Sequence, residues 1–244
     1  MNSLAILLLA GGYSRRMGQN KANLTMEGQT FAEKIAAELS SCGPVYLSVS
    51  ADISPDFKAN TEKYPRIVDE IPHIGPLGGI SAAMHQTDAE AYFVCACDMP
   101  RMNAAFVRHL IQIWEQNNTD SSPHSGSVLS SGRSSDIPHQ PGSLNHLRPE
   151  FACQFVSDVS RQRKSTFPDA LLVRNRSGRI YTTAGIYHRN ILPLIEKQIL
   201  EKNYRLRDLL TESNVFYLEE NSLGELKSCL ININTMEEYQ KLSE

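Results

Sequence analysis

One loop near the N-terminus gathers residue types that hold phosphate groups. Gly11 and Gly12 end the first apolar run, and the cations Arg15, Arg16 and Lys21 follow. Because glycine has no Cβ, backbone N–H groups there can approach an anion closely, and the three cations add fixed positive charge. The loop therefore favours a polyphosphate ligand. The alternative is an ordinary surface loop with scattered charges.

This loop differs from the two common phosphate-binding loops. The GxxxxGK[ST] pattern is absent, because the residue five positions after Gly12 is Met17 and not a glycine. The GxGxxG pattern also lacks its third glycine, so a dehydrogenase that binds a dinucleotide is disfavoured.

A carboxylate, Asp98, directly follows the apolar run 92–97. Open α/β sheets bind their ligands at the carboxyl ends of their strands, and carboxylate oxygens suit Mg²⁺, which bridges nucleotide phosphates. The position therefore predicts a metal ligand. The alternative is that Asp98 merely caps the following turn.

A second carboxylate, Asp69, follows the short apolar run 67–68, and a turn that contains Gly75 and Gly79 comes next. A carboxylate can accept hydrogen bonds from the N1–H and the exocyclic amine of guanine, a pairing that distinguishes guanine from adenine. Asp69 is thus a candidate for base recognition, while the glycine segment could also be only a tight turn.

Asn232 and Asn234 flank Ile233 near the C-terminus, and their side-chain carbonyls could complete a metal or substrate site. As an alternative, Asn234 could simply cap a helix. The seven histidines show no metal-ligand spacing. The five cysteines show no CxxC pair, so we expect reduced thiols in a cytosolic protein.

The elements that must position these residues alternate between strands and helices. Thr30 and Glu33 have the spacing of a capping box, Asn103 is a plausible helix cap, and Asn234 with Glu237 predicts a capped C-terminal helix. Other helices are predicted over 79–86, 102–115, 191–202 and 206–210, and strands over 4–10, 45–50, 67–68, 91–97, 169–173, 181–187, 215–218 and 229–233. This alternation predicts a mostly parallel sheet with helices on both faces.

The amino-acid composition changes between residues 117 and 167. Of the 34 residues 117–150, nine are Ser, four are Pro and three are Gly, so little apolar surface is available to offset the entropy of ordering. We expect a flexible insertion over about 117–167 within a single domain that spans 1–244.

Composition excludes several classes of function. The chain has 244 residues, of which 41% are hydrophobic, and its formal charge is −3, so nucleic acid is not an expected partner. The longest apolar run, residues 4–10, is too short to cross a membrane and has no features of a signal peptide, so we expect a cytoplasmic protein without membrane contact.

Together, these motifs resemble the molybdenum cofactor guanylyltransferase family, within the nucleotidyltransferases of Rossmann-like, nucleotide-diphospho-sugar transferase type. The family's motif LAGGxSxRMGxDKxLL stands at residues 9–24 as LAGGYSRRMGQNKANL, with Asn20 and Asn23 in place of Asp and Leu. Its D…GPLxG motif matches Asp69 with 75–79. Its CDxP motif matches 97–100, and its NxNTPEE motif matches 232–238. The resemblance covers about 5–116 and 169–241, and the Ser-rich segment has no counterpart in it.

The resemblance implies a role for each matched residue. The GTP site would be formed by Leu9, Ala10, Gly11, Gly12, Lys21, Asp69, Gly75, Gly79 and Asp98. Asp98 would also hold Mg²⁺, Lys21 and Arg16 would act on the phosphates, and Asn232 and Asn234 would lie on the molybdopterin side. A position near Ser48 or Ser50 that often carries a nucleotide-contacting Asn is Ser in this chain.

The expected activity is transfer of GMP from GTP to molybdenum-bound molybdopterin, with release of pyrophosphate. Expected partners are GTP, the molybdopterin cofactor, and proteins that insert the cofactor or receive it as molybdoenzymes. Two alternatives stay open. One is a nucleotidyltransferase that uses CTP or another nucleotide. The other is a silent homologue that binds nucleotide or cofactor without turnover, which Asn20 and the serines at 48 and 50 would suit.

Overall fold

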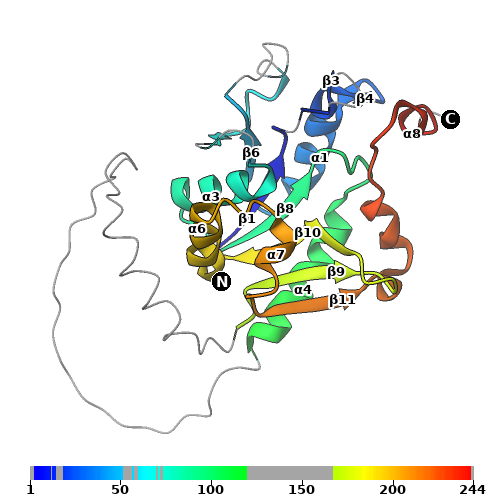
Figure 1. Ribbon diagram of the computed structural model, residues 1–244. Coiled ribbons are helices and arrows are strands. Elements are labelled where there is room, and N and C mark those ends of the chain that lie inside the picture. Colours follow the sequence, from blue (N-terminus) through cyan, green and yellow to red (C-terminus); the bar gives the residue numbers. More distant parts are fainter. Residues whose placement is uncertain are drawn as a thin grey trace, which may run out of the picture.

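A seven-stranded sheet with helices on both faces forms the centre of the molecule (Figure 1). The computed structural model describes residues 3–11, 13–14, 19–51, 57, 60–69, 71, 74–119 and 167–242. The strand order is β11-β9-β10-β8-β1-β6-β7, and within this sheet β10 alone runs against its neighbours. The strands are β1 (Leu4–Leu9), β6 (Val45–Val49), β7 (Arg66–Val68), β8 (Ala91–Ala96), β9 (Ala170–Arg174), β10 (Ile180–His188) and β11 (Val215–Glu219). The predicted mostly parallel sheet is confirmed.

Both faces of β1 are buried, as its unbroken apolar run predicted. Ile6 and Leu8 pack in one core with α1 (Phe31–Leu39) and α4 (Ala104–Thr119). Ala5 and Leu7 point the other way, into a second core. That core contains α3 (Pro76–Gln86), α6 (Leu192–Leu200) and α7 (Leu206–Leu209). Successive side chains of a strand alternate between faces, so a strand in the middle layer must be apolar at every position.

Two predicted helix caps are confirmed. Thr30 and Glu33 form a reciprocal capping box at the start of α1. At the start of α4, Asn103 Oδ1 accepts a hydrogen bond from the Phe106 N–H at 2.9 Å. In contrast, α3 begins at Pro76, three residues before the predicted start at Gly79. Proline is favoured in the first turn of a helix because its φ is already helical, so the glycine segment is the first turn of α3 and not a separate loop.

Short hairpins shape the chain after β1. The strand β2 (Tyr13–Ser14) pairs with β3 (Gln19–Asn20), and β4 (Thr25–Met26) pairs with β5 (Gln29–Thr30). The turn between β4 and β5 contains Gly28, with φ of 80°. The 3-10 helix η1 (Lys21–Asn23) joins the two hairpins. The first crossover, residues 10–44 between β1 and β6, therefore contains two hairpins and a 3-10 helix before α1 begins.

Two predictions at the C-terminal end are wrong. Residues 229–233 do not form a strand: the 3-10 segment η4 (Glu220–Leu230) ends there, and Ile233 N–H bonds to the backbone of Asp98. Asn234 does not cap the last helix, because Thr235 and Glu238 form the capping box of α8 (Met236–Gln240). Cys229, Leu230 and Ile233 are buried by packing beside the sheet and not by joining it, while Ile231 is exposed.

The serine-rich stretch lies almost entirely outside the described residues. Helix α4 continues to Thr119, and the description resumes at residue 167, so the expected flexible insertion stays a prediction. The 3-10 helix η3 (Arg189–Ile191) follows β10. Among the described residues, no helix combines the length and apolar character that crossing a bilayer requires. The four cysteines that the structure describes, Cys42, Cys95, Cys97 and Cys229, form no disulfide bond with one another, and Cys153 lies outside the described residues.

Candidate functional site

The carboxyl ends of four neighbouring parallel strands, β8, β1, β6 and β7, meet at one edge of the sheet (Figure 1). Backbone hydrogen bonds tie these ends together: Ala10 N–H donates to Ser48 O at 2.8 Å, and Cys97 N–H donates to Leu9 O at 3.1 Å. Asp69 N–H donates to the carbonyl of Val49 at 3.1 Å. The predicted residues Leu9, Ala10, Asp69 and Asp98 therefore share this edge.

Gly11 lets the chain leave β1 close to the end of β6. A Cβ at this position would lie 2.9 Å from the backbone nitrogen of Ser50, so any other residue would force the two segments apart. The backbone of Lys21 belongs to η1, and neighbouring Ala22 is buried in the same core as Cys97 and Ala10. Gly12, Arg16 and the side chain of Lys21 lie outside the described residues, so their predicted contacts with phosphate stay predictions.

Asp69 is half-buried, and its carboxylate accepts a hydrogen bond from a neighbouring strand. Ser48 Oγ donates to Asp69 Oδ1 at 2.9 Å. Burial raises the pKa of Asp69 above its ordinary value, and the Ser48 hydrogen bond opposes that rise because it favours the charged form. A Cβ on Gly78 would lie 3.7 Å from Asp69 Oδ2, so the carboxylate faces the first turn of α3.

The two predicted glycines of α3 have different physical reasons. Gly75 precedes the helix with φ of 69°, a conformation that other residues rarely adopt. Gly79 is buried, and a Cβ there would collide with Ser48 Oγ and approach Leu9 Cδ2 to 2.9 Å. Gly79 thus allows α3 to pack against β1 and β6. Contact of either glycine with a nucleotide stays a prediction.

A C-terminal strap, residues 231–242, crosses to the same edge. The Ile233 N–H donates to Asp98 O at 2.8 Å, and the Ile233 side chain packs with Leu24 and Phe31 from the first crossover. Farther along the strap, Tyr239 O–H donates to Thr25 O at 2.6 Å. The strap therefore brings the backbone of 232–234 beside Asp98, while a role of Asn232 and Asn234 on the molybdopterin side stays a prediction.

The donors beside Asp98 fit a Mg²⁺ ion. Asn232 Oδ1 is a buried hard oxygen with no hydrogen-bond partner in the described part of the chain, and the next residue, Ile233, bonds through its backbone to Asp98 O. The described residues contain no group of three or more His, Cys, Asp or Glu side chains placed to hold a metal. Mg²⁺ is compatible with so few protein ligands, since it keeps several waters and binds substrate phosphates.

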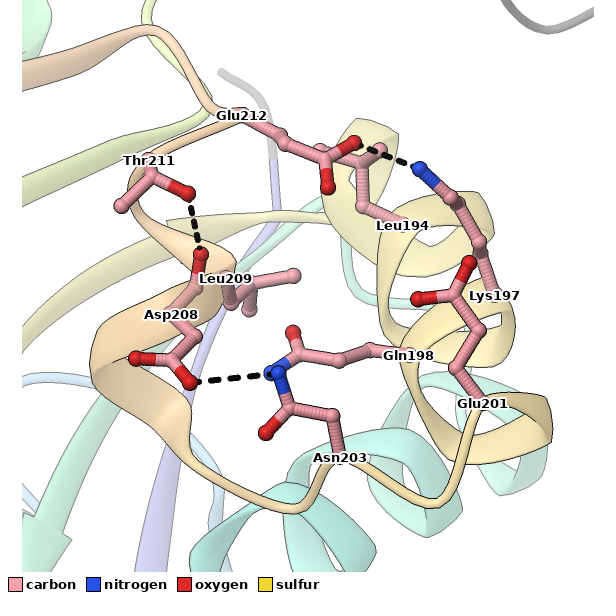
Figure 2. Close-up of a pocket in the computed structure, with 9 residues that line it drawn as sticks. All are labelled: Leu194, Lys197, Gln198, Glu201, Asn203, Asp208, Leu209, Thr211 and Glu212. Carbon is pink, nitrogen blue, oxygen red and sulfur yellow. Dashed lines mark hydrogen bonds and ion pairs between the residues drawn. The ribbon is translucent and has the colours of Figure 1, made fainter.

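A small pocket lies elsewhere, between α6 and α7, with a volume of about 110 Å³ (Figure 2). Its polar groups bond to one another: Lys197 Nζ donates to Glu212 at 2.8 Å, and Asn203 donates to Asp208 Oδ2 at 3.2 Å. None of the predicted site residues lines it. We therefore assign the candidate site to the sheet edge.

Sequence reasoning missed two members of this site. Ser48 was considered only as a departure from the family's Asn, although its partner is Asp69. Ile233 was assigned to a strand, although it anchors the strap to Asp98. A serine within the apolar run 45–49 was the signal that the sequence offered for Ser48, and the apolar residue between two asparagines was the signal for Ile233.

Comparisons with known proteins identify the family of this chain. A family model described as "MobA-like NTP transferase domain" matches residues 6–216. A Bacillus cytotoxicus protein named "Probable molybdenum cofactor guanylyltransferase" is 25% identical over 251 residues, which cover 99% of this chain and 97% of the relative. A Bacillus subtilis protein of the same name is 26% identical over 239 residues, covering 98% of this chain and 94% of the relative.

A solved structure shares the fold across nearly the whole chain. Molybdopterin-guanine dinucleotide biosynthesis protein A from Archaeoglobus fulgidus superimposes with a TM-score of 0.68. The two sequences are 18% identical, and the superposition covers 98% of this chain and 96% of the other. At that identity, the similarity concerns the fold: a mostly parallel sheet flanked by helices.

Proposed function

The chain belongs to the MobA-like NTP transferase domain family, and from this premise we propose that it transfers GMP from GTP to molybdenum-bound molybdopterin. The observation that carries the proposal is the meeting of Asp69, Asp98 and the 232–234 segment at one sheet edge, beside the glycine turn that leaves β1. The names of the curated relatives support guanylyl transfer as the reaction.

In the proposed reaction, the terminal phosphate of molybdopterin attacks the α-phosphorus of GTP. A new P–O bond forms to the attacking oxygen, the bond between the α-phosphorus and the bridging oxygen breaks, and pyrophosphate leaves. The attacking phosphate is already anionic, so no strong general base is needed, and catalysis consists of positioning and charge stabilisation.

Each residue at the edge has a task in this proposal. Asp98 would hold Mg²⁺ with help from the Asn232 carbonyl, and the bound ion would supply neutralising charge at the phosphates. Lys21 and the Gly11 and Gly12 amides would hold the departing pyrophosphate. Asp69 would accept hydrogen bonds from guanine.

Asp98→Ala tests the proposal. We expect the variant to fold and to lose at least about 10²-fold in the rate of pyrophosphate release from GTP with Mg²⁺ and molybdopterin, the scale of removing one preorganised charge. The matched control is Asp88→Ala. Asp88 is an exposed aspartate that precedes β8, whereas Asp98 follows it, and this variant should retain the wild-type rate. A wild-type rate in Asp98→Ala would show that the metal assignment is wrong.

A nucleotide panel separates the alternatives with the same assay. Pyrophosphate release with CTP and none with GTP would replace guanylyl transfer by another nucleotidyl transfer on this fold. Tight nucleotide binding without pyrophosphate release from any nucleotide would instead indicate a binder that has lost turnover.

A further inference from the structure

Ser48 is a buried polar residue at the centre of the sheet edge, with 2% of its surface exposed. It lies in β6, paired with Leu9 of β1 on one side and Ile67 of β7 on the other. A buried hydroxyl needs a hydrogen-bond partner, and this one donates to Asp69 Oδ1 at 2.9 Å. The interaction connects the middle of the sheet to the carboxylate that follows β7.

The surroundings leave Ser48 little freedom. Gly79 of α3 packs so closely that any Cβ there would collide with Ser48 Oγ, and the same Cβ would lie 3.1 Å from Ser48 Cβ. The helix therefore presses on the serine from the side opposite the strand backbone. Contacts from β6, α3 and the end of β7 together fix both the hydroxyl and the carboxylate that it bonds.

The orientation of the Asp69 carboxylate follows from these contacts. Oδ1 accepts from Ser48, and Oδ2 faces Gly78 in the first turn of α3. A carboxylate has about four acceptor positions, so one serine bond leaves others for a ligand. Ser48 itself has a single hydroxyl hydrogen, and that hydrogen is given to Asp69. Its influence on a ligand is therefore exerted through Asp69.

We propose that Ser48 is a positioning residue for nucleobase selection: its hydrogen bond holds the Asp69 carboxylate in the orientation that accepts the N1–H and the 2-amino group of guanine. This inference rests on the proposed function and deepens it. Adenine presents an acceptor at N1 and no 2-amino group, and hypoxanthine lacks only the 2-amino group. A fixed carboxylate distinguishes the three bases, whereas a freely rotating one accepts a single donor from any orientation.

The experiment measures dissociation constants of the full chain for GTP, ITP and ATP with Mg²⁺ by calorimetry, and kcat and KM by pyrophosphate release. For Ser48→Ala, we expect GTP to bind about tenfold more weakly, the scale of one lost hydrogen bond, while ATP binding and kcat change little. The GTP-over-ATP preference should fall by the same factor. A purely structural role would weaken all three nucleotides together.

A double-mutant cycle tests whether Ser48 acts through Asp69. Asp69→Asn should abolish the guanine preference, and adding Ser48→Ala to it should have no further effect on GTP affinity. The matched control is Thr61→Val, which removes another buried hydroxyl, bonded to Phe57 O at 2.6 Å, and should leave the preference unchanged. Ser48→Cys keeps the side-chain volume with a weaker donor, and it replaces Ser48→Ala if that variant does not fold.

The outcomes separate this inference from the proposed function. If the wild type prefers GTP and Asp69→Asn loses that preference while the Ser48 variants keep it, the positioning role is overturned and the proposed function stands. Effects of the two substitutions that multiply in the double variant would also overturn it. A wild type without any guanine preference would overturn the base assignment in the proposed function itself.

Discussion

His188, the last residue of β10, combines two contacts that depend on its protonation. Its ring stacks on Trp114, with centroids 6.2 Å apart and planes at 28°, and its Nδ1 accepts a hydrogen bond from the Asn190 N–H at 3.1 Å. Burial lowers the pKa of His188 below 6.5; nearby Glu90 and Asp169 oppose this shift, and Arg189 adds to it. The folded protein therefore favours the neutral imidazole.

This arrangement predicts a fluorescence change on acidification. Because the folded pKa is lowered, the unfolded chain binds a proton more readily, so the contribution of His188 to stability is complete above pH 6.5 and is lost as the pH falls through the folded pKa. The protonated ring quenches Trp114, the only tryptophan, and the quenching midpoint should lie below pH 6.5. The transition should be absent in His188→Gln and present in His109→Gln; its persistence in His188→Gln would contradict the assignment.

The two carboxylates of the site could be predicted from sequence, whereas the side-chain partner of Asp69 could not. Asp69 and Asp98 directly follow apolar runs, and parallel strands present their carboxyl ends to ligands, so local pattern was sufficient. The Ser48 contact joins residues 21 positions apart. It depends on the pairing register of β6 and β7 and on how closely α3 packs, which no local pattern specifies.

Arg189 is the residue that joins three elements at the amino edge of the sheet. Its guanidinium donates to Ala89 O at 2.9 Å, to Met84 O at 2.6 Å, to Thr87 O and to the Tyr92 hydroxyl at 2.8 Å. The carbonyls in the last turn of a helix have no intrahelical donor, so Arg189 satisfies the end of α3 while it anchors β10 beside β8.

We therefore expect Arg189→Lys to destabilise the fold. A lysine ammonium keeps the charge but cannot reproduce a planar fork with bonds to four oxygens, and the expected loss is about 2–4 kcal/mol in the free energy of unfolding. Urea denaturation followed by circular dichroism would measure it. Arg176→Lys, at an exposed turn position, is the matched control and should change stability by less than about 0.5 kcal/mol. Equal effects in the two variants would contradict the anchoring role.

At the level of elements, apolar runs and caps predicted the parallel strands and the starts of α1 and α4, but they failed for 229–233. That stretch has the apolar content of a strand, yet its hydrogen bonding is irregular and Ile233 bonds to the turn after β8. A buried segment that forms no β-sheet hydrogen bonds has the same apolar sequence pattern as a buried strand. The sequence also could not show that Thr235 and not Asn234 caps the last helix, because both residues are good caps with a glutamate three positions later.

The C-terminal strap packs against the first crossover, beside the candidate site. The strap buries Ile233 against Leu24 and Phe31, and Tyr239 packs edge-on against Phe31 with ring centroids 5.8 Å apart. This cluster is much smaller than the two cores that flank the sheet. Segments held by few buried apolar contacts open at lower free energy than the core, so the strap should behave as a local unit.

Ile233→Ala tests that behaviour. Removing buried methyl groups from a core costs about 2–5 kcal/mol, so amide hydrogen exchange at 231–242 should accelerate at least tenfold. Exchange in β1 and β8 should stay at the wild-type rate, because those strands belong to the larger cores. Ile231→Ala provides the control on the same segment: this side chain is 43% exposed, against 2% for Ile233, and its removal should leave strap exchange unchanged. If Ile233→Ala instead accelerates exchange equally in the strap and in the central strands, the strap unfolds only with the whole molecule, and its separate role at the site edge is wrong.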